Sequence, residues 1–178
     1  MKLHYSPDEI ISIITYSGVN IDGERYYMNE DEFGNTLFQA KLSHHDNEAV
    51  SMKHNETGII FDIFPVRFIY GYKIKAYFKV NEDFNYTHLY LWNNHLSADA
   101  NILAPAVFTK AIGLPNQDSN FIVLEGVLPC VHRNEWNQPE VFNVYTEIML
   151  FNFVYAFAQE AENFLRHLEH TGEYFDIT

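Results

Sequence analysis

The sequence predicts an α+β fold, a mostly antiparallel sheet of about five to six strands packed by a long C-terminal helix. Alternating apolar and polar residues recur between residues 38 and 80, the period of half-buried strands. A helical pattern opens the chain, and one of roughly 30 residues closes it. We expect shorter helices near the N-terminus and before the last strand.

The first helix carries a start signal. Ser6 can act as N-cap, Pro7 occupies the first helical position, and Glu9 completes a capping box. Gly18 is a natural place for the helix to stop. The residues expected to face the core are Ile10, Ile13 and Ile14.

The clearest strand pattern covers residues 66–80, where every even position is apolar. This stretch is long for one strand, so Gly71 is expected to mark a bulge or a bend. Shorter patterns predict strands at residues 38–42, 50–53 and 59–64. A loop over residues 81–85 is then expected to lead into a strand at residues 86–92.

The second half predicts more helix. A short helix opens near Ser97 and Asp99, continues through residues 106–112, and ends at Gly113. A strand at residues 121–128 follows, and the last helix is expected from Pro139 to about His170. Residues 148–157 of that helix are apolar in nearly every direction, which predicts burial all round. Either the short helices or a second subunit must then cover its far side, so a homodimer contact through this helix is one prediction.

Composition bounds the class of protein. The 178 residues predict a single domain over residues 1–178, and 47% hydrophobic residues can build a core without disulfides. The formal charge of −13 disfavours nucleic acid and anionic membrane surfaces and favours a basic protein partner; the alternative is that it only confers solubility. Cys130 is the single cysteine, which fits a reducing compartment, and the start lacks the apolar stretch of a signal peptide. A cytoplasmic location is the expectation.

One face of the predicted strand at residues 66–80 is a candidate binding surface. Its odd positions would place basic side chains in a stripe with one tyrosine among them. Such a stripe can bind a phosphate, a carboxylate or an acidic peptide. The alternative is that the lysines protect an exposed edge strand from aggregation. The candidate residues are Arg67, Lys73, Lys75, Tyr77 and Lys79.

A metal site is the second candidate. His44, His45 and Asp46 lie together in an expected turn, and His54 follows. Imidazole and carboxylate are ligands that zinc or iron prefers. The alternative is that these are solvated turn histidines, since their spacing matches no known site. His167 and His170, three apart on the last helix, are read mainly as complements to the helix dipole.

The leading functional hypothesis is a non-catalytic acidic protein-binding module, of immunity, inhibitor or adaptor type, that engages a basic protein partner. Phosphate-binding glycine loops, Gly-x-Ser-x-Gly, Cys-x-x-Cys and His-Glu-x-x-His are absent, so we expect no cofactor and lean against an enzyme. The alternatives are a holdase-like chaperone or small hydrophobic ligand binder, and a metal-dependent enzyme that uses the His/Asp ligands. Residues 101–105, Asn-Ile-Leu-Ala-Pro, are similar to a helix start in the export chaperone SecB, and no site residue follows from that resemblance.

Overall fold

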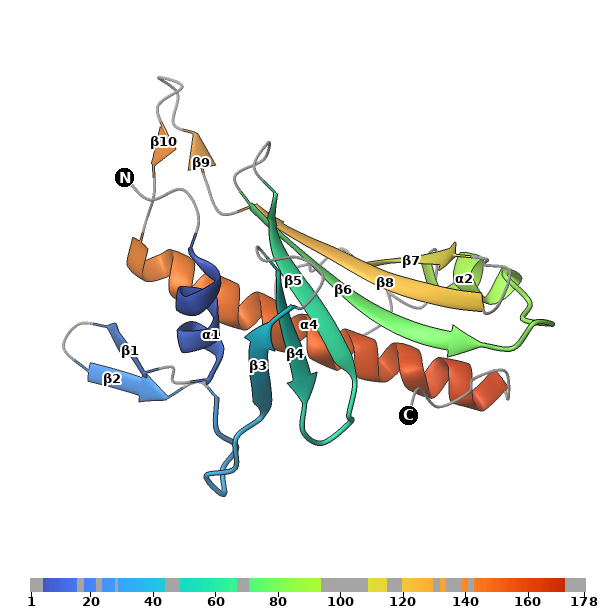
Figure 1. The fold of residues 1–178 in the computed structure, drawn as a ribbon, viewed down its shortest axis with the longest axis horizontal. Coiled ribbons are helices and arrows are strands. Elements are labelled where there is room, and N and C mark those ends of the chain that lie inside the picture. The colour runs from blue at the N-terminus through green and yellow to red at the C-terminus, as the bar shows by residue number, and fades with distance from the viewer. Residues whose placement is uncertain are drawn as a thin grey trace.

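A computed structural model gives the fold (Figure 1). It describes residues 5–15, 18–21, 24–27, 29–43, 49–66, 71–93, 109–114, 120–129, 132–133, 139–140 and 143–171. In these residues a six-stranded antiparallel sheet lies beside a long C-terminal helix and a short N-terminal helix, which confirms the predicted α+β class. The elements are α1 (Pro7–Thr15), β1 (Gly18–Ile21), β2 (Glu24–Tyr27), β3 (Phe38–Leu42), β4 (Val50–His54), β5 (Ile60–Val66), β6 (Gly71–Val80), α2 (Thr87–Leu91), β7 (Thr109–Leu114), β8 (Asn120–Pro129), β9 (His132–Arg133), β10 (Pro139–Glu140) and α4 (Asn143–Thr171).

The main sheet has the strand order β3-β4-β5-β6-β8-β7, and β1-β2 and β9-β10 form two small pairs. Register assigns each side chain to a face, because paired residues point the same way. One row runs Met52, Phe61, Ala76 and Leu124, all buried in the core. The neighbouring row runs Ser51, Asp62, Lys75 and Glu125 and lies on the opposite side, which we call the outer face.

Helix α4 lies across the core face of the sheet (Figure 1). Its Phe157 meets Phe61 of β5 edge to face, with ring centroids 5.9 Å apart. Farther along, Phe164 meets Phe78 of β6 at 5.1 Å in the same geometry. These contacts add a directional term to the burial of large rings and fix how the helix crosses the strands.

Helix α1 begins as the sequence predicts. The Ser6 N–H donates to Glu9 Oε2 at 2.7 Å, and the Glu9 N–H donates to Ser6 Oγ at 3.3 Å. This reciprocal pair is the predicted capping box. The three predicted isoleucines of the helix are all buried.

The prediction of one long strand over residues 66–80 is wrong. Strand β5 ends at Val66 and β6 begins at Gly71, and these two residues face each other in an antiparallel pair. Fifteen extended residues would span roughly 50 Å, longer than strands of small domains reach, so the chain folds back and pairs with itself. Alternation holds within β6, where Tyr72, Ile74, Ala76, Phe78 and Val80 are buried.

Two predictions in the middle of the chain are also wrong. Residues 87–91 form helix α2 instead of a strand, because the Thr87 N–H donates to Asn85 Oδ1 at 3.0 Å and Leu89 and Trp92 are buried three residues apart. Residues 109–112 belong to strand β7 instead of a helix. The proposed helix start at Ser97 and Asp99, and the SecB-like string, lie outside the described residues.

Helix α4 differs from prediction at its start and on one side. It begins at Asn143, while Pro139 and Glu140 form β10, so Glu140 does not lie in its first turn. Within residues 148–157, Met149, Asn152 and Tyr155 are exposed, so burial all round is wrong for the single chain. No helix in the described ranges is long and apolar enough to cross a membrane.

At each edge of the sheet, an asparagine side chain forms hydrogen bonds with the backbone of one residue of the edge strand. Asn29 accepts the Phe38 N–H of edge strand β3 at 3.0 Å and donates to the Phe38 carbonyl at 3.4 Å. Asn93 does the same for Ala111 of edge strand β7, at 2.8 and 3.0 Å. Each amide takes the place of one residue of a missing neighbour strand, which hinders the addition of another chain at these positions.

Candidate binding surfaces

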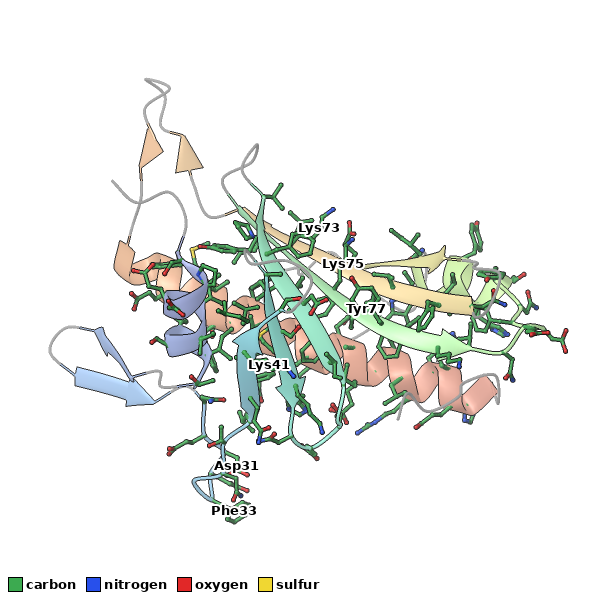
Figure 2. The ribbon with its side chains drawn as sticks, viewed as in Figure 1. Asp31, Phe33, Lys41, Lys73, Lys75 and Tyr77 are labelled. Carbon is green, nitrogen blue, oxygen red and sulfur yellow. The ribbon has the colours of Figure 1, made fainter. Side chains whose placement is uncertain are left out.

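The outer face carries the basic residues singled out in the sequence. Lys73, Lys75, Tyr77 and Lys79 alternate along β6 with the buried residues, so all four lie on the outer face (Figure 2). The buried side chains of α1 and α4 pack on the other side of the sheet. Arg67, the fifth predicted member, lies outside the described residues.

Two of these lysines are neutralised by a neighbouring strand. Glu125 of β8 accepts Lys73 Nζ at 2.9 Å and lies 3.8 Å from Lys75 Nζ. Asp62 of β5, opposite Lys75 in the register, accepts the Ser51 hydroxyl at 2.5 Å. The predicted positive stripe is therefore interrupted at its centre, where the carboxylates of Asp62 and Glu125 lie among the lysines.

Tyr77 lies close to the two carboxylates. Partial burial raises the pKa of its phenol, and the negative charges of Asp62 and Glu125 raise it further. The hydroxyl therefore stays protonated at neutral pH and is available as a hydrogen-bond donor beside an exposed ring surface.

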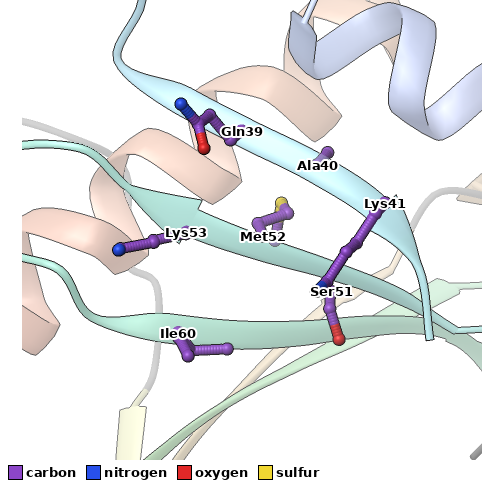
Figure 3. Close-up of a pocket in the computed structure, with 7 residues that line it drawn as sticks. All are labelled: Gln39, Ala40, Lys41, Ser51, Met52, Lys53 and Ile60. Atoms are coloured by element: carbon purple, nitrogen blue, oxygen red, sulfur yellow. The ribbon is translucent and has the colours of Figure 1, made fainter. Parts of the chain in front are cut away.

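A second basic region lies on β3 and β4, and sequence reasoning missed it. Lys41 and Lys53 are exposed on the outer face, and neither forms an ion pair with a described residue. They border a hollow of about 280 Å³ (Figure 3). Alternation in the two strands shows that these lysines point outward, but only the β3–β4 register, which pairs Lys41 with Ser51 and Lys53 with Gln39, places both beside the same hollow. The lining residues are Gln39, Ala40, Lys41, Ser51, Met52, Lys53 and Ile60.

The predicted metal ligands divide between described and undescribed residues. His44, His45 and Asp46 lie outside the described residues. His54 is buried, and its Nδ1 lies 3.1 Å from Thr57 Oγ1 and accepts the Thr57 N–H at 3.3 Å. Burial lowers the pKa of its imidazole, although the charges of Glu56 and Glu162 oppose this effect. Within the described ranges no group of three or more His, Cys, Asp or Glu side chains could hold a metal ion, and the metal site stays a prediction.

The acidic loop, defined as residues 29–37, displays the most exposed large apolar side chain among the described residues. Phe33 at its tip is 79% exposed, and the neighbouring Glu30 and Glu32 are exposed too (Figure 2). The sequence analysis did not single out this stretch. A lone phenylalanine directly after three acidic residues was the available signal, but only the structure shows that it points away from the core.

Asp31 orders this loop. Its Oδ1 accepts the Phe33 N–H at 2.9 Å and the Asn35 N–H at 2.8 Å, and its Oδ2 accepts Asn35 Nδ2 at 3.0 Å. These bonds, led by the Asn35 side chain, hold the pKa of Asp31 below its usual value. Gly34 adopts φ = 79°, which closes the turn and favours glycine. The loop is therefore ordered before any partner binds.

Comparison of the chain with protein-family models, with curated proteins and with solved structures finds no match.

Proposed function

We propose that the protein is a non-catalytic protein-binding module, of immunity, inhibitor or adaptor type, that engages a basic protein partner. The observation that carries this proposal is Phe33, an aromatic side chain held almost fully in solvent at the tip of an ordered acidic loop. Buried aromatic anchors dominate the energetics of protein interfaces, and Phe33 is free to enter a pocket on a partner.

The loop's order and charge support the same proposal. The hydrogen bonds of Asp31 limit the conformations of residues 31–35, so binding would lose little further chain entropy. Glu30 and Glu32 precede the anchor and favour a partner whose pocket has a basic rim. The net charge of −13 adds long-range attraction for such a partner and speeds encounter at low salt.

The proposal is tested by affinity capture from the lysate of the protein's own host. The baits are wild type, Phe33→Ala, Asp31→Ala and a matched control, Tyr155→Ala, on exposed α4 surface. We expect a basic protein that wild type and Tyr155→Ala retain, that Phe33→Ala loses, and that Asp31→Ala retains weakly because its loop is no longer preordered.

Salt dependence separates this outcome from unspecific adsorption. A charge-steered contact weakens as the salt concentration rises, whereas retention by hydrophobic adsorption does not. If every bait retains the same proteins, Phe33 is not an anchor and the proposal fails.

A further inference from the structure

The hollow on β3–β5, lined by the seven residues given above, has the chemistry of a small docking site. Ile60 forms its apolar part and is 52% exposed, so its side chain offers an apolar contact surface. Lys41 and Lys53 stand at its margin without an ion pair among the described residues (Figure 3). By contrast, Lys73 and Lys75 on the same face share Glu125. The lining therefore suits an occupant that is both acidic and apolar.

Its size limits what that occupant is. At about 280 Å³ it lies at the lower end of the roughly 300–1,000 Å³ range of small-molecule pockets. A space of this size suits one aromatic side chain together with the charged groups beside it. The segment that suits this hollow is an aromatic residue with carboxylates beside it.

The chain itself carries such a segment. Phe33 is exposed on the acidic loop directly after Glu30, Asp31 and Glu32, and the loop leads into β3, which lines the hollow. Asn29 and Asn93 occupy the backbone groups of Phe38 and Ala111, one residue on each edge strand, which hinders strand addition at these two positions. Charge and shape therefore favour a contact on the outer face.

We propose that a second copy of this chain occupies the hollow, with Phe33 of its acidic loop against Ile60 and its glutamates beside Lys41 and Lys53. The loop leads into β3, one of the strands that line the hollow, so a two-fold arrangement would set the loop of each copy on the hollow of the other. A reciprocal contact of this kind closes a two-fold dimer and leaves no site for further growth. The same loop is the one proposed to bind a basic partner, so the dimer and that complex exclude each other.

The test is sedimentation equilibrium of the purified full chain at physiological ionic strength, where the repulsion between two copies of charge −13 is screened beyond about 8 Å. We expect the mass to rise with loading concentration from 20.9 kDa toward twice that value. Phe33→Ala should raise the dissociation constant at least about tenfold, the loss expected for a central anchor.

Charge reversal makes the test specific. One variant reverses the hollow, with Lys41→Glu and Lys53→Glu, and the other reverses the loop, with Glu30→Lys and Glu32→Lys. Each variant alone places like charges in both contacts and should be monomeric. Mixed together they place opposite charges in both contacts, so a dimer should return. All four residues are exposed or at the surface, and a denaturation curve for each variant confirms that it is folded.

A control addresses the other predicted dimer surface. Met149→Ser with Tyr155→Ser changes the exposed side of α4 and should leave the dimer intact. A chain that is monomeric throughout, variants that do not recover on mixing, or a dimer lost only in the α4 variant would each overturn this inference. Because the experiment uses no foreign protein, a purified monomer together with Phe33-dependent capture would reject the dimer and keep the proposed function.

Discussion

Asn29 and Asn93 show how much one side chain can decide in this fold. Each amide bonds to both backbone groups of a single residue on an edge strand. Asn29 also donates to the Thr15 carbonyl at 3.3 Å, so it joins the end of α1 to the edge of the sheet. Only a side chain with both a donor and an acceptor can make this pair of bonds.

Replacing Asn29 by Ala should therefore be costly. The substitution leaves the Phe38 N–H and carbonyl buried without their partner, and each such group costs roughly 1–3 kcal/mol. We expect the free energy of unfolding to fall by about 2 kcal/mol or more in urea titrations. Asn163→Ala on the exposed side of α4 is the control and should change stability by about 0.5 kcal/mol or less. Equal effects of the two substitutions would contradict the role given to Asn29.

One histidine, His167, is expected to make the stability of the fold depend on pH. Its ring packs beside Trp92 and His88 with centroids 5.8 and 5.9 Å away, and its buried Nε2 has no hydrogen-bond partner among the described residues. Burial lowers the pKa of this imidazole, and the nearby His88 and His170 lower it further, although a backbone hydrogen bond involving His88 opposes them. The folded protein therefore favours neutral His167.

Stability should consequently decrease in mild acid. The unfolded histidine has a pKa of about 6.5 and binds a proton before the folded one does, so this contribution is full above that pH and is lost as the pH falls below it. The buried His54 acts in the same direction. We expect the urea midpoint to fall between about pH 7.5 and pH 5.5, and to fall less in His167→Phe. Parallel curves for the two proteins would show that His167 is not responsible.

For the helices and strands, features that depend on neighbouring residues could be predicted from the sequence, whereas the pairing of strands could not. The capping box at Ser6 and Glu9 needs only four residues of sequence, and it forms as predicted. The break between β5 and β6 depends on the antiparallel pairing of Val66 with Gly71. For α2, the aromatic run around Tyr90 favours a strand by propensity, while burial of Leu89 and Trp92 selects the helix.

The candidate surfaces follow the same rule. Alternation was sufficient to place Lys73, Lys75, Tyr77 and Lys79 on one face of β6. It could not show that Glu125 neutralises two of them, because that contact depends on the register of β6 with β8. The hollow beside Lys41 and Lys53 likewise exists only once β3 and β4 are paired.

Helix α4 gives a test at this scale. Phe157 is fully buried against Phe61, whereas Met149, two turns earlier on the same helix, is 45% exposed. Phe157→Ala should cost roughly 3–5 kcal/mol of stability, and Met149→Ala less than about 1 kcal/mol. Chemical denaturation at a single low protein concentration measures both. A large cost at Met149 would mean that a second subunit covers this side of the helix.

Across the whole molecule, basic and acidic side chains gather on different surfaces. The outer face carries Lys41, Lys53, Lys73, Lys75 and Lys79 and, among its described acids, Asp62 and Glu125. The acidic loop exposes Glu30 and Glu32, and Phe33 directly after them. A protein of charge −13 thus presents two surfaces of opposite local sign, and the ordered loop is the one that combines charge with an exposed aromatic anchor.

Photocrosslinking from position 33 in the native host, with Phe33 replaced by a benzophenone amino acid, tests most directly whether the acidic loop binds another protein. Position 155 on α4, where Tyr155 is exposed, serves as the matched control. The account predicts an adduct with a basic protein that forms from position 33 and not from position 155. No adduct at position 33, or the same adducts from both positions, would contradict the claim that the acidic loop is a protein-binding site.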